Sequence, residues 1–147
     1  MHQIILGYWD TAAAEGLRAV LDALPDDTGR VIYVSSSGVY GQDSGEWVDE
    51  ESACEPVSAG GRACLSGERL LSAHPRGRDA VVLRLAGLYG PGRTPYVTHV
   101  RSTIPIAGSR DAFLNLVHVD DAAAAVVAAV DHRGQRRAHR AAPAPRG

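Results

Sequence analysis

The 147-residue sequence contains no lysine, because all 15 of its basic residues are arginine. An arginine cannot replace the compact ammonium group that some active sites require. Aromatic residues make up only 5% of the chain. The sequence also shows no signal peptide and no apolar run long enough to span a bilayer, so we expect a cytoplasmic protein without a membrane partner.

Cysteine is equally scarce, with Cys54 and Cys64 as its two copies. Their spacing does not match a metal-binding motif, so we expect free thiols in a reducing compartment and no metal site. His118 lies near Asp120 and Asp121, but adjacent acids at a helix start are typical of a cap, and we expect Asp120 to cap a helix. The net charge of −2 gives no reason to expect specific nucleic-acid binding.

The clearest structural signal is the stretch RVIYVSSSGVYG, from Arg30 to Gly41. Arg30 to Val34 have the composition of a short buried β-strand, and Ser35-Ser36-Ser37-Gly38 then interrupt it. Open α/β sheets bind ligands at the carboxyl ends of their strands, which makes these serines candidate site residues. A plain Ser/Gly turn after a strand explains the same residues.

Alternating strand and helix patterns along the chain predict an α/β fold. We expect further strands within 1–9, over 79–85 and over 115–119, with helices over 11–24, 57–73, 96–103 and 121–130. Residues 131–147 are rich in arginine, alanine and proline and lack an apolar period, so we expect a disordered tail. We expect residues 1–130 to form the folded domain.

Three segments, in order, resemble the extended short-chain dehydrogenase/reductases of the NAD-dependent epimerase/dehydratase family. They are RVIYVSSSGVYG (30–41), VVLRLAGLYGPGR (81–93) and NLVHVDDAAAAVV (115–127). The resemblance implies a partial Rossmann-like, doubly wound parallel sheet in a three-layer αβα fragment. It also implies NAD or NADP as cofactor and a small-molecule substrate.

The resemblance assigns roles to individual residues. It makes Ser36 the family's catalytic hydroxyl, and it places Ser37 and Arg93 towards the substrate. The implied cofactor contacts are Ser35, Ser36, Ala86, Gly87 and Leu88. The polar segment 42–56, with its run Glu46, Asp49, Glu50, Glu51 and Glu55, would lie beside the substrate, although a solvated surface loop explains the charges equally well.

Two of the family's features are missing from this sequence. Active members carry Tyr-x-x-x-Lys on one helix, where the lysine lowers the pKa of the phenol. Here Gly60 stands in place of the tyrosine and Cys64 in place of the lysine. The Gly-rich turn GxxGxxG, which binds the cofactor pyrophosphate, does not occur between a strand and a helix. We therefore expect negligible binding of NAD or NADP.

These observations favour a truncated or degenerate epimerase/dehydratase-type oxidoreductase that is inactive alone. The parent chemistry would be hydride transfer on a sugar nucleotide or a similar hydroxyl compound. The alternative is a non-catalytic binding or protein-interaction module built on the same sheet. Loss of neighbouring strands would leave an exposed sheet edge that favours self-association, and it would expose Leu17, Val20 and Leu21.

Overall fold

The computed structural model describes the backbone of residues 2–7 and 13–15 and all atoms of residues 16–95, 97, 101, 102, 105 and 113–131. The elements in chain order are β1 (His2–Gly7), α1 (Ala13–Ala23), β2 (Thr28–Ser36), the 3-10 helix η1 (Ser37–Val39), α2 (Ala59–Ala73), the 3-10 helix η2 (Pro75–Gly77), β3 (Val81–Leu85), β4 (Gly87–Tyr89), β5 (Leu116–His118) and α4 (Val119–Asp131). In this part of the chain no helix is long and apolar enough to cross a membrane.

The main sheet has the order β1-β2-β3, and both pairs of strands are parallel. Ile32 of β2 lies opposite Ile5 of β1 and Val81 of β3. The short strands β4 and β5 form a second parallel pair. The predicted parallel α/β architecture is therefore confirmed.

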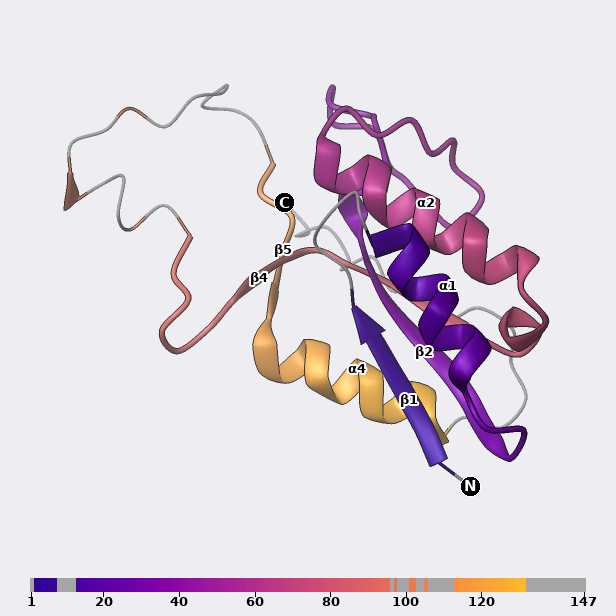
Figure 1. Ribbon diagram of the computed structural model, residues 1–147. Helices are drawn as coiled ribbons and strands as arrows, with labels where there is room; N and C mark the ends of the chain where they lie inside the picture. The colour runs from indigo at the N-terminus through magenta and orange to yellow at the C-terminus, as the bar shows by residue number, and fades with distance from the viewer. Residues whose placement is uncertain are drawn as a thin grey trace.

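The two helices that connect these strands lie on the same face of the sheet, and α4 lies on the opposite face (Figure 1). Connections between parallel strands are almost always right-handed. Since β1 to β2 and β2 to β3 step in the same direction, right-handedness places α1 and α2 on one side. The result is a three-layer αβα arrangement.

Alternate residues of β2 supply the core on the two faces. Val31 and Tyr33 pack with Leu21 and Leu71 under α1 and α2. Ile32 packs with Val81, Leu83 and Ala129 under α4. A hydrogen bond of 3.1 Å from Arg30 Nη1 to the Ala129 carbonyl also joins the start of β2 to the end of α4. Each face of the sheet thus has its own apolar cluster.

One expectation about the core was wrong. Leu21, which we expected to be exposed, is fully buried, because it faces the sheet and α2. Leu17 is partly buried against the same cluster, and Val20 is 42% exposed.

Several element boundaries also differ from expectation. β2 continues through Ser35 and Ser36, because both still pair with β3. α4 begins at Val119, so Asp120 lies within its first turn and is not its cap. The His118 Nδ1 atom instead accepts a hydrogen bond of 3.2 Å from the Asp120 backbone N–H.

Other predictions fall largely outside the described residues. Most of the predicted helix 96–103 is among them, as is the tail beyond Asp131. The domain boundary at residue 130 and the disorder of 131–147 stay predictions.

Candidate functional site

The candidate site lies where β2 and β3 end. Ser35 pairs in register with Arg84, and Ser36 pairs with Leu85, so Ala86 follows directly beside the serines. The Ser36 Oγ accepts a hydrogen bond of 3.0 Å from the Gly38 backbone N–H and caps η1. Its hydroxyl therefore satisfies a backbone group in the turn, and its own O–H can still donate to a ligand.

Ser35 has a different environment from Ser36. Its side chain is buried, and its hydroxyl donates a hydrogen bond of 2.6 Å to Oε1 of Glu68 on α2. Any contact between Ser35 and a cofactor would therefore compete with this bond or use the backbone.

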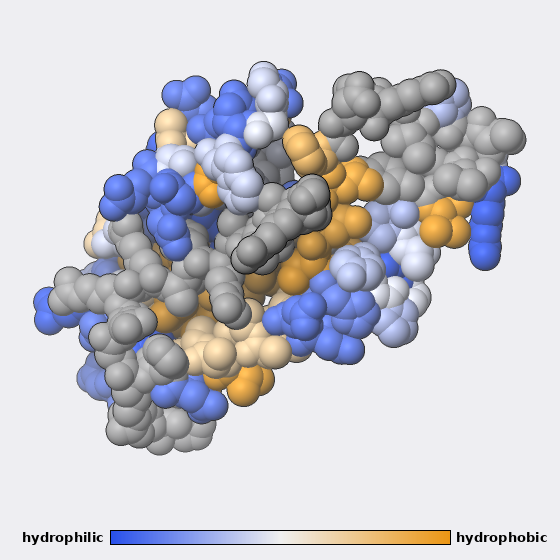
Figure 2. Space-filling model, turned by 180° about the vertical axis from the view of Figure 1, so that it is seen from behind, coloured by the Kyte–Doolittle hydropathy of each residue, from blue (hydrophilic) through white to orange (hydrophobic). Residues whose placement is uncertain are grey.

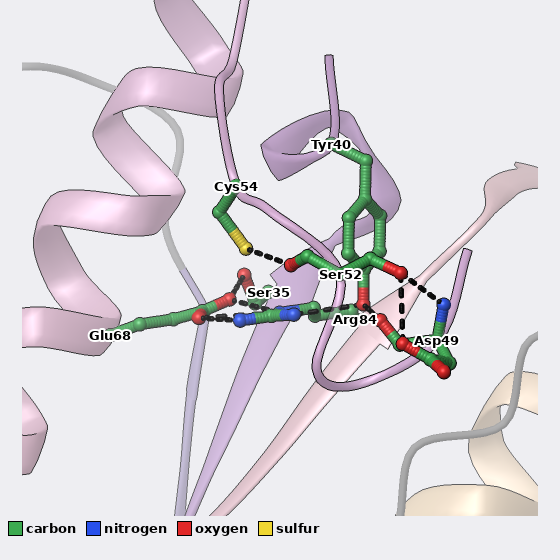
Figure 3. Close-up of polar contacts among 7 residues, drawn as sticks. All are labelled: Ser35, Tyr40, Asp49, Ser52, Cys54, Glu68 and Arg84. Atoms are coloured by element: carbon green, nitrogen blue, oxygen red, sulfur yellow. Dashed lines mark hydrogen bonds and ion pairs between the residues drawn. The ribbon is translucent and has the colours of Figure 1, made fainter. Parts of the chain in front are cut away.

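Glu68 also forms a buried ion pair with Arg84 of β3 (Figure 3). Arg84 Nε lies 3.0 Å from Oε1, and Arg84 Nη2 lies 2.7 Å from Oε2, which is a bidentate geometry. The Glu68 side chain is 9% exposed, and the Arg84 side chain is 12% exposed. Hydrogen bonding to Glu68 raises the pKa of Arg84, against the opposing effect of burial. Glu68 and Arg84 thus form a satisfied pair of charges inside the molecule.

Hydrogen bonds through Tyr40 connect the ion pair to segment 42–56, which we call the acidic loop. Arg84 Nη1 donates a hydrogen bond of 2.8 Å to the Tyr40 hydroxyl, which in turn donates one of 2.8 Å to the Asp49 carbonyl. The Asp49 carboxylate accepts hydrogen bonds from the Ser52 hydroxyl and the Glu51 backbone N–H. Figure 3 shows this chain of contacts from Ser35 to the acidic loop.

Sequence reasoning missed this network. A signal for it was present, since Arg84 is the one charge in the otherwise apolar run VVLRL. A buried charge needs a partner, but the sequence does not identify Glu68 as that partner.

Gly60 and Cys64, the positions that the family resemblance assigns to the dyad, both lie on α2. Gly60 is exposed, and a Cβ placed there would meet nothing within 4 Å. Cys64 is buried against Val39 and Leu65. Burial raises the pKa of the Cys64 thiol, and its contact with Ser35 acts in the opposite direction. The position that the family resemblance assigns to the lysine therefore holds a neutral, buried group.

Of the remaining predicted site residues, Gly87, Leu88 and Arg93 lie at or near β4, and Ser37 lies in η1. Gly87 and Leu88 pair with β5, and a Cβ at Gly87 would come within 2.8 Å of Leu116. Arg93 is exposed, and its Nε donates a hydrogen bond of 3.1 Å to the Leu88 carbonyl. Ser37 begins η1 and is partly buried. The roles of these residues towards cofactor and substrate stay predictions.

The described residues contain no group of three or more His, Cys, Asp or Glu side chains that could hold a metal ion. His118 is instead in contact with the ring of Tyr89 at 5.1 Å between centroids, and it accepts the hydrogen bond from Asp120.

Comparison with known proteins decides the family. The family model of the NAD dependent epimerase/dehydratase family matches residues 5–140. This chain belongs to that family. Among curated proteins, it is 38% identical over 97 residues to protein YeeZ of Escherichia coli K12, a match that covers 66% of this chain and 34% of YeeZ.

Solved structures of family members are also similar. A protein assigned to the NAD-dependent epimerase/dehydratases from Methylobacillus flagellatus is 32% identical with a TM-score of 0.71, and the match covers 92% of this chain and 52% of that one. The UDP-glucuronic acid 4-epimerase of Bacillus cereus, in complex with UDP-glucuronic acid and NAD, is 25% identical with a TM-score of 0.68. That match covers 86% of this chain and 43% of the epimerase. This chain thus spans about a third of YeeZ and about half of these structures.

Proposed function

We propose that this chain is a degenerate member of the epimerase/dehydratase family and does not catalyse the family's reaction by itself. The parent chemistry is hydride transfer between a nicotinamide cofactor and a sugar nucleotide or a similar hydroxyl compound. The observation that carries the proposal is the pair of residues at the dyad positions, exposed Gly60 and buried Cys64.

The chemistry of these residues supports the proposal. Glycine supplies no phenol that could act as general acid or base. The Cys64 thiol, with its raised pKa, supplies no positive charge beside such a phenol. The nearby Tyr40 hydroxyl already has partners on both sides, Arg84 and the Asp49 carbonyl. Ser36 can orient a ligand, but no base is in place to activate it.

We also propose that the isolated chain binds NAD+ or NADP+ negligibly. The predicted cofactor contacts include Ala86, Gly87 and Leu88, which offer only backbone and apolar groups. No ammonium group is present at position 64 to add to them. We keep the cytoplasmic location as part of the proposal, in line with the free thiols of Cys54 and Cys64.

Two measurements on the purified chain test this function. NAD+ and UDP-glucuronic acid, the pair bound in the Bacillus cereus structure, are incubated with the chain while NADH and altered sugar are monitored. We expect no turnover from the wild type or from Ser36→Ala. Turnover that is lost in Ser36→Ala would overturn the proposal. Calorimetric titration with NAD+ separates binding from chemistry, and micromolar binding would contradict the second part.

The alternative function, a protein-interaction module, has its own support. Within the described residues, β1 and β3 each pair with β2 on one side only, which leaves an outer edge on each strand. Figure 2 shows hydrophobic side chains gathered across the face seen from behind. Exposed apolar residues include Phe113 at 78% and Leu114 at 64%. We propose self-association through a sheet edge, and light scattering showing a clean monomer would contradict it.

A further inference from the structure

We infer that Tyr40 and Arg84 are positioning residues that fix the acidic loop against the carboxyl edge of the sheet. The loop carries six carboxylates, at Asp43, Glu46, Asp49, Glu50, Glu51 and Glu55, and no basic residue. Like charges so close together repel one another and oppose a compact loop. Contacts from outside the loop therefore help to hold it in one place.

Most hydrogen bonds within the loop are local. The Ser44 N–H donates to Glu46, and the Asp49 N–H donates to Ser52. Bonds between residues two or three apart shape a turn, but they do not attach it to the rest of the molecule.

The base of the loop is closed separately. A Cβ at Gly41 would overlap the Glu55 carbonyl, so the two ends of the loop pass very close together. Gln42 Nε2 also donates a hydrogen bond of 3.2 Å to the Ala53 carbonyl. Cys54 packs against the cluster of Val39, Cys64 and Leu65. The first two contacts join the two ends of the loop to each other, and Cys54 attaches the second end to the core; none of them involves the middle of the loop.

The Tyr40 hydroxyl holds that middle through its bond to the Asp49 carbonyl. Arg84 orients the hydroxyl from the other side, because its Nη1 donates to the same oxygen. Arg84 is itself fixed by the bidentate pair with Glu68, which also binds Ser35. A largely buried, hydrogen-bonded charge therefore helps to determine where the loop lies, and it links the loop to the serine strand.

Through this link the hydrogen-bond network can also affect ligand binding, a step that rests on the proposed function. If the loop lies beside the substrate, as the family resemblance implies, Tyr40 and Arg84 set the shape of the substrate entrance without touching the reacting atoms. The structural part of the inference does not depend on any activity.

Hydrogen exchange measured by mass spectrometry on the full chain tests the inference. Tyr40→Phe removes one hydroxyl and keeps both the ring and the Glu68–Arg84 pair. We expect peptides within 43–52 to exchange about threefold to tenfold faster, as the loss of one hydrogen bond implies. Peptides from β2 and α2 should exchange as in the wild type. Tyr89→Phe is the matched control, and it should leave 43–52 unchanged.

Proteolysis gives a second readout. The loop contains four glutamates and no arginine, so a protease specific for glutamate should cut Tyr40→Phe within the loop faster than the wild type. Unchanged exchange and cleavage in the loop would overturn the inference. Equal acceleration in the loop, β2 and α2 would also overturn it, because the variant would then have lost global stability. Neither measurement uses NAD or a substrate, so failure here is distinct from failure of the proposed function.

Discussion

The two halves of helix α2 differ in how their residues are used. The first half holds Gly60, which is exposed and where an added Cβ would meet nothing within 4 Å, at the position that the family resemblance assigns to the tyrosine. The second half holds Glu68, which is 9% exposed and bonded to Ser35 and Arg84. The second half of α2 thus supplies a side chain to the polar network, whereas Gly60 in the first half supplies none. A buried charge cannot be removed singly without a large cost in stability, whereas a substitution at an exposed position usually changes stability little.

The largest expected effect comes from breaking the buried pair. Glu68→Ala leaves the Arg84 guanidinium buried without a counter-charge, so we expect a loss of about 3–5 kcal/mol in the free energy of unfolding. Urea denaturation followed by circular dichroism measures this loss. Glu55→Ala, at an exposed position, is the matched control and should change stability by less than about 0.5 kcal/mol. A small effect of Glu68→Ala would mean that water reaches Arg84.

Two glycines of α2 sharpen the same comparison. A Cβ at Gly67 would overlap the Tyr33 hydroxyl, so Gly67→Ala should destabilise the chain by about 1–3 kcal/mol. A Cβ at Gly60 meets nothing, and alanine favours the helix, so Gly60→Ala should stabilise it by up to about 1 kcal/mol. Thermal unfolding of the two variants should shift in opposite directions. Shifts of the same sign would show that the two halves of α2 are alike.

Ser36→Ala tests the candidate hydroxyl as a structural group. The substitution removes the acceptor for the Gly38 N–H, so we expect a cost of about 0.5–1.5 kcal/mol with the fold intact. Urea denaturation again provides the measurement. A cost near zero would mean that water replaces the bond, which would leave Ser36 free to serve a ligand.

The smallest effect concerns pH and Cys64. Because its folded-state pKa is raised, the neutral thiol contributes stability that is present below the ordinary thiol pKa of 9.0. That contribution is lost as pH rises through the folded-state pKa. Stability measured from pH 7 upward should therefore fall less steeply in Cys64→Ala.

In the native chain, iodoacetamide should modify the partly exposed Cys54 before the buried Cys64.

Much of the fold was predictable because local patterns of apolar residues determine the type of each element. The apolar run of β2 and the apolar residues of α2 gave the right element types. The absence of a phenol and an ammonium at Gly60 and Cys64 was also evident from the sequence alone. The strand β5 lies within the predicted strand 115–119, whereas β4 was less predictable, because residues 87–89 had the composition of a loop.

The polar network could not be predicted, because its contacts depend on tertiary register. Arg84 reaches Glu68 only because β3 lies beside β2 and under α2 at that level. The same register turns Ser35 towards Glu68 and leaves Ser36 at the turn. Strand alternation does distinguish these adjacent serines, because it places Ser35 on the same face as Val31 and Tyr33, but it does not identify Glu68 as the partner of Ser35. The burial of Leu21 likewise depends on the position of α2 relative to α1.

The placement of α1 and α2 on one face has a consequence for synthesis of the protein on the ribosome. Once β3 has been synthesised, α1 and α2 can already cover one face of the sheet. Ile32, Val81 and Leu83 on the opposite face are covered only after α4 has been synthesised. The first residue of α4 follows about 34 residues after Leu85, or about 2–7 s later at ~5–20 residues per second. During that interval the apolar face of Ile32, Val81 and Leu83 lacks its cover by α4, and exposed apolar surface of this kind is what makes incompletely folded chains prone to aggregate.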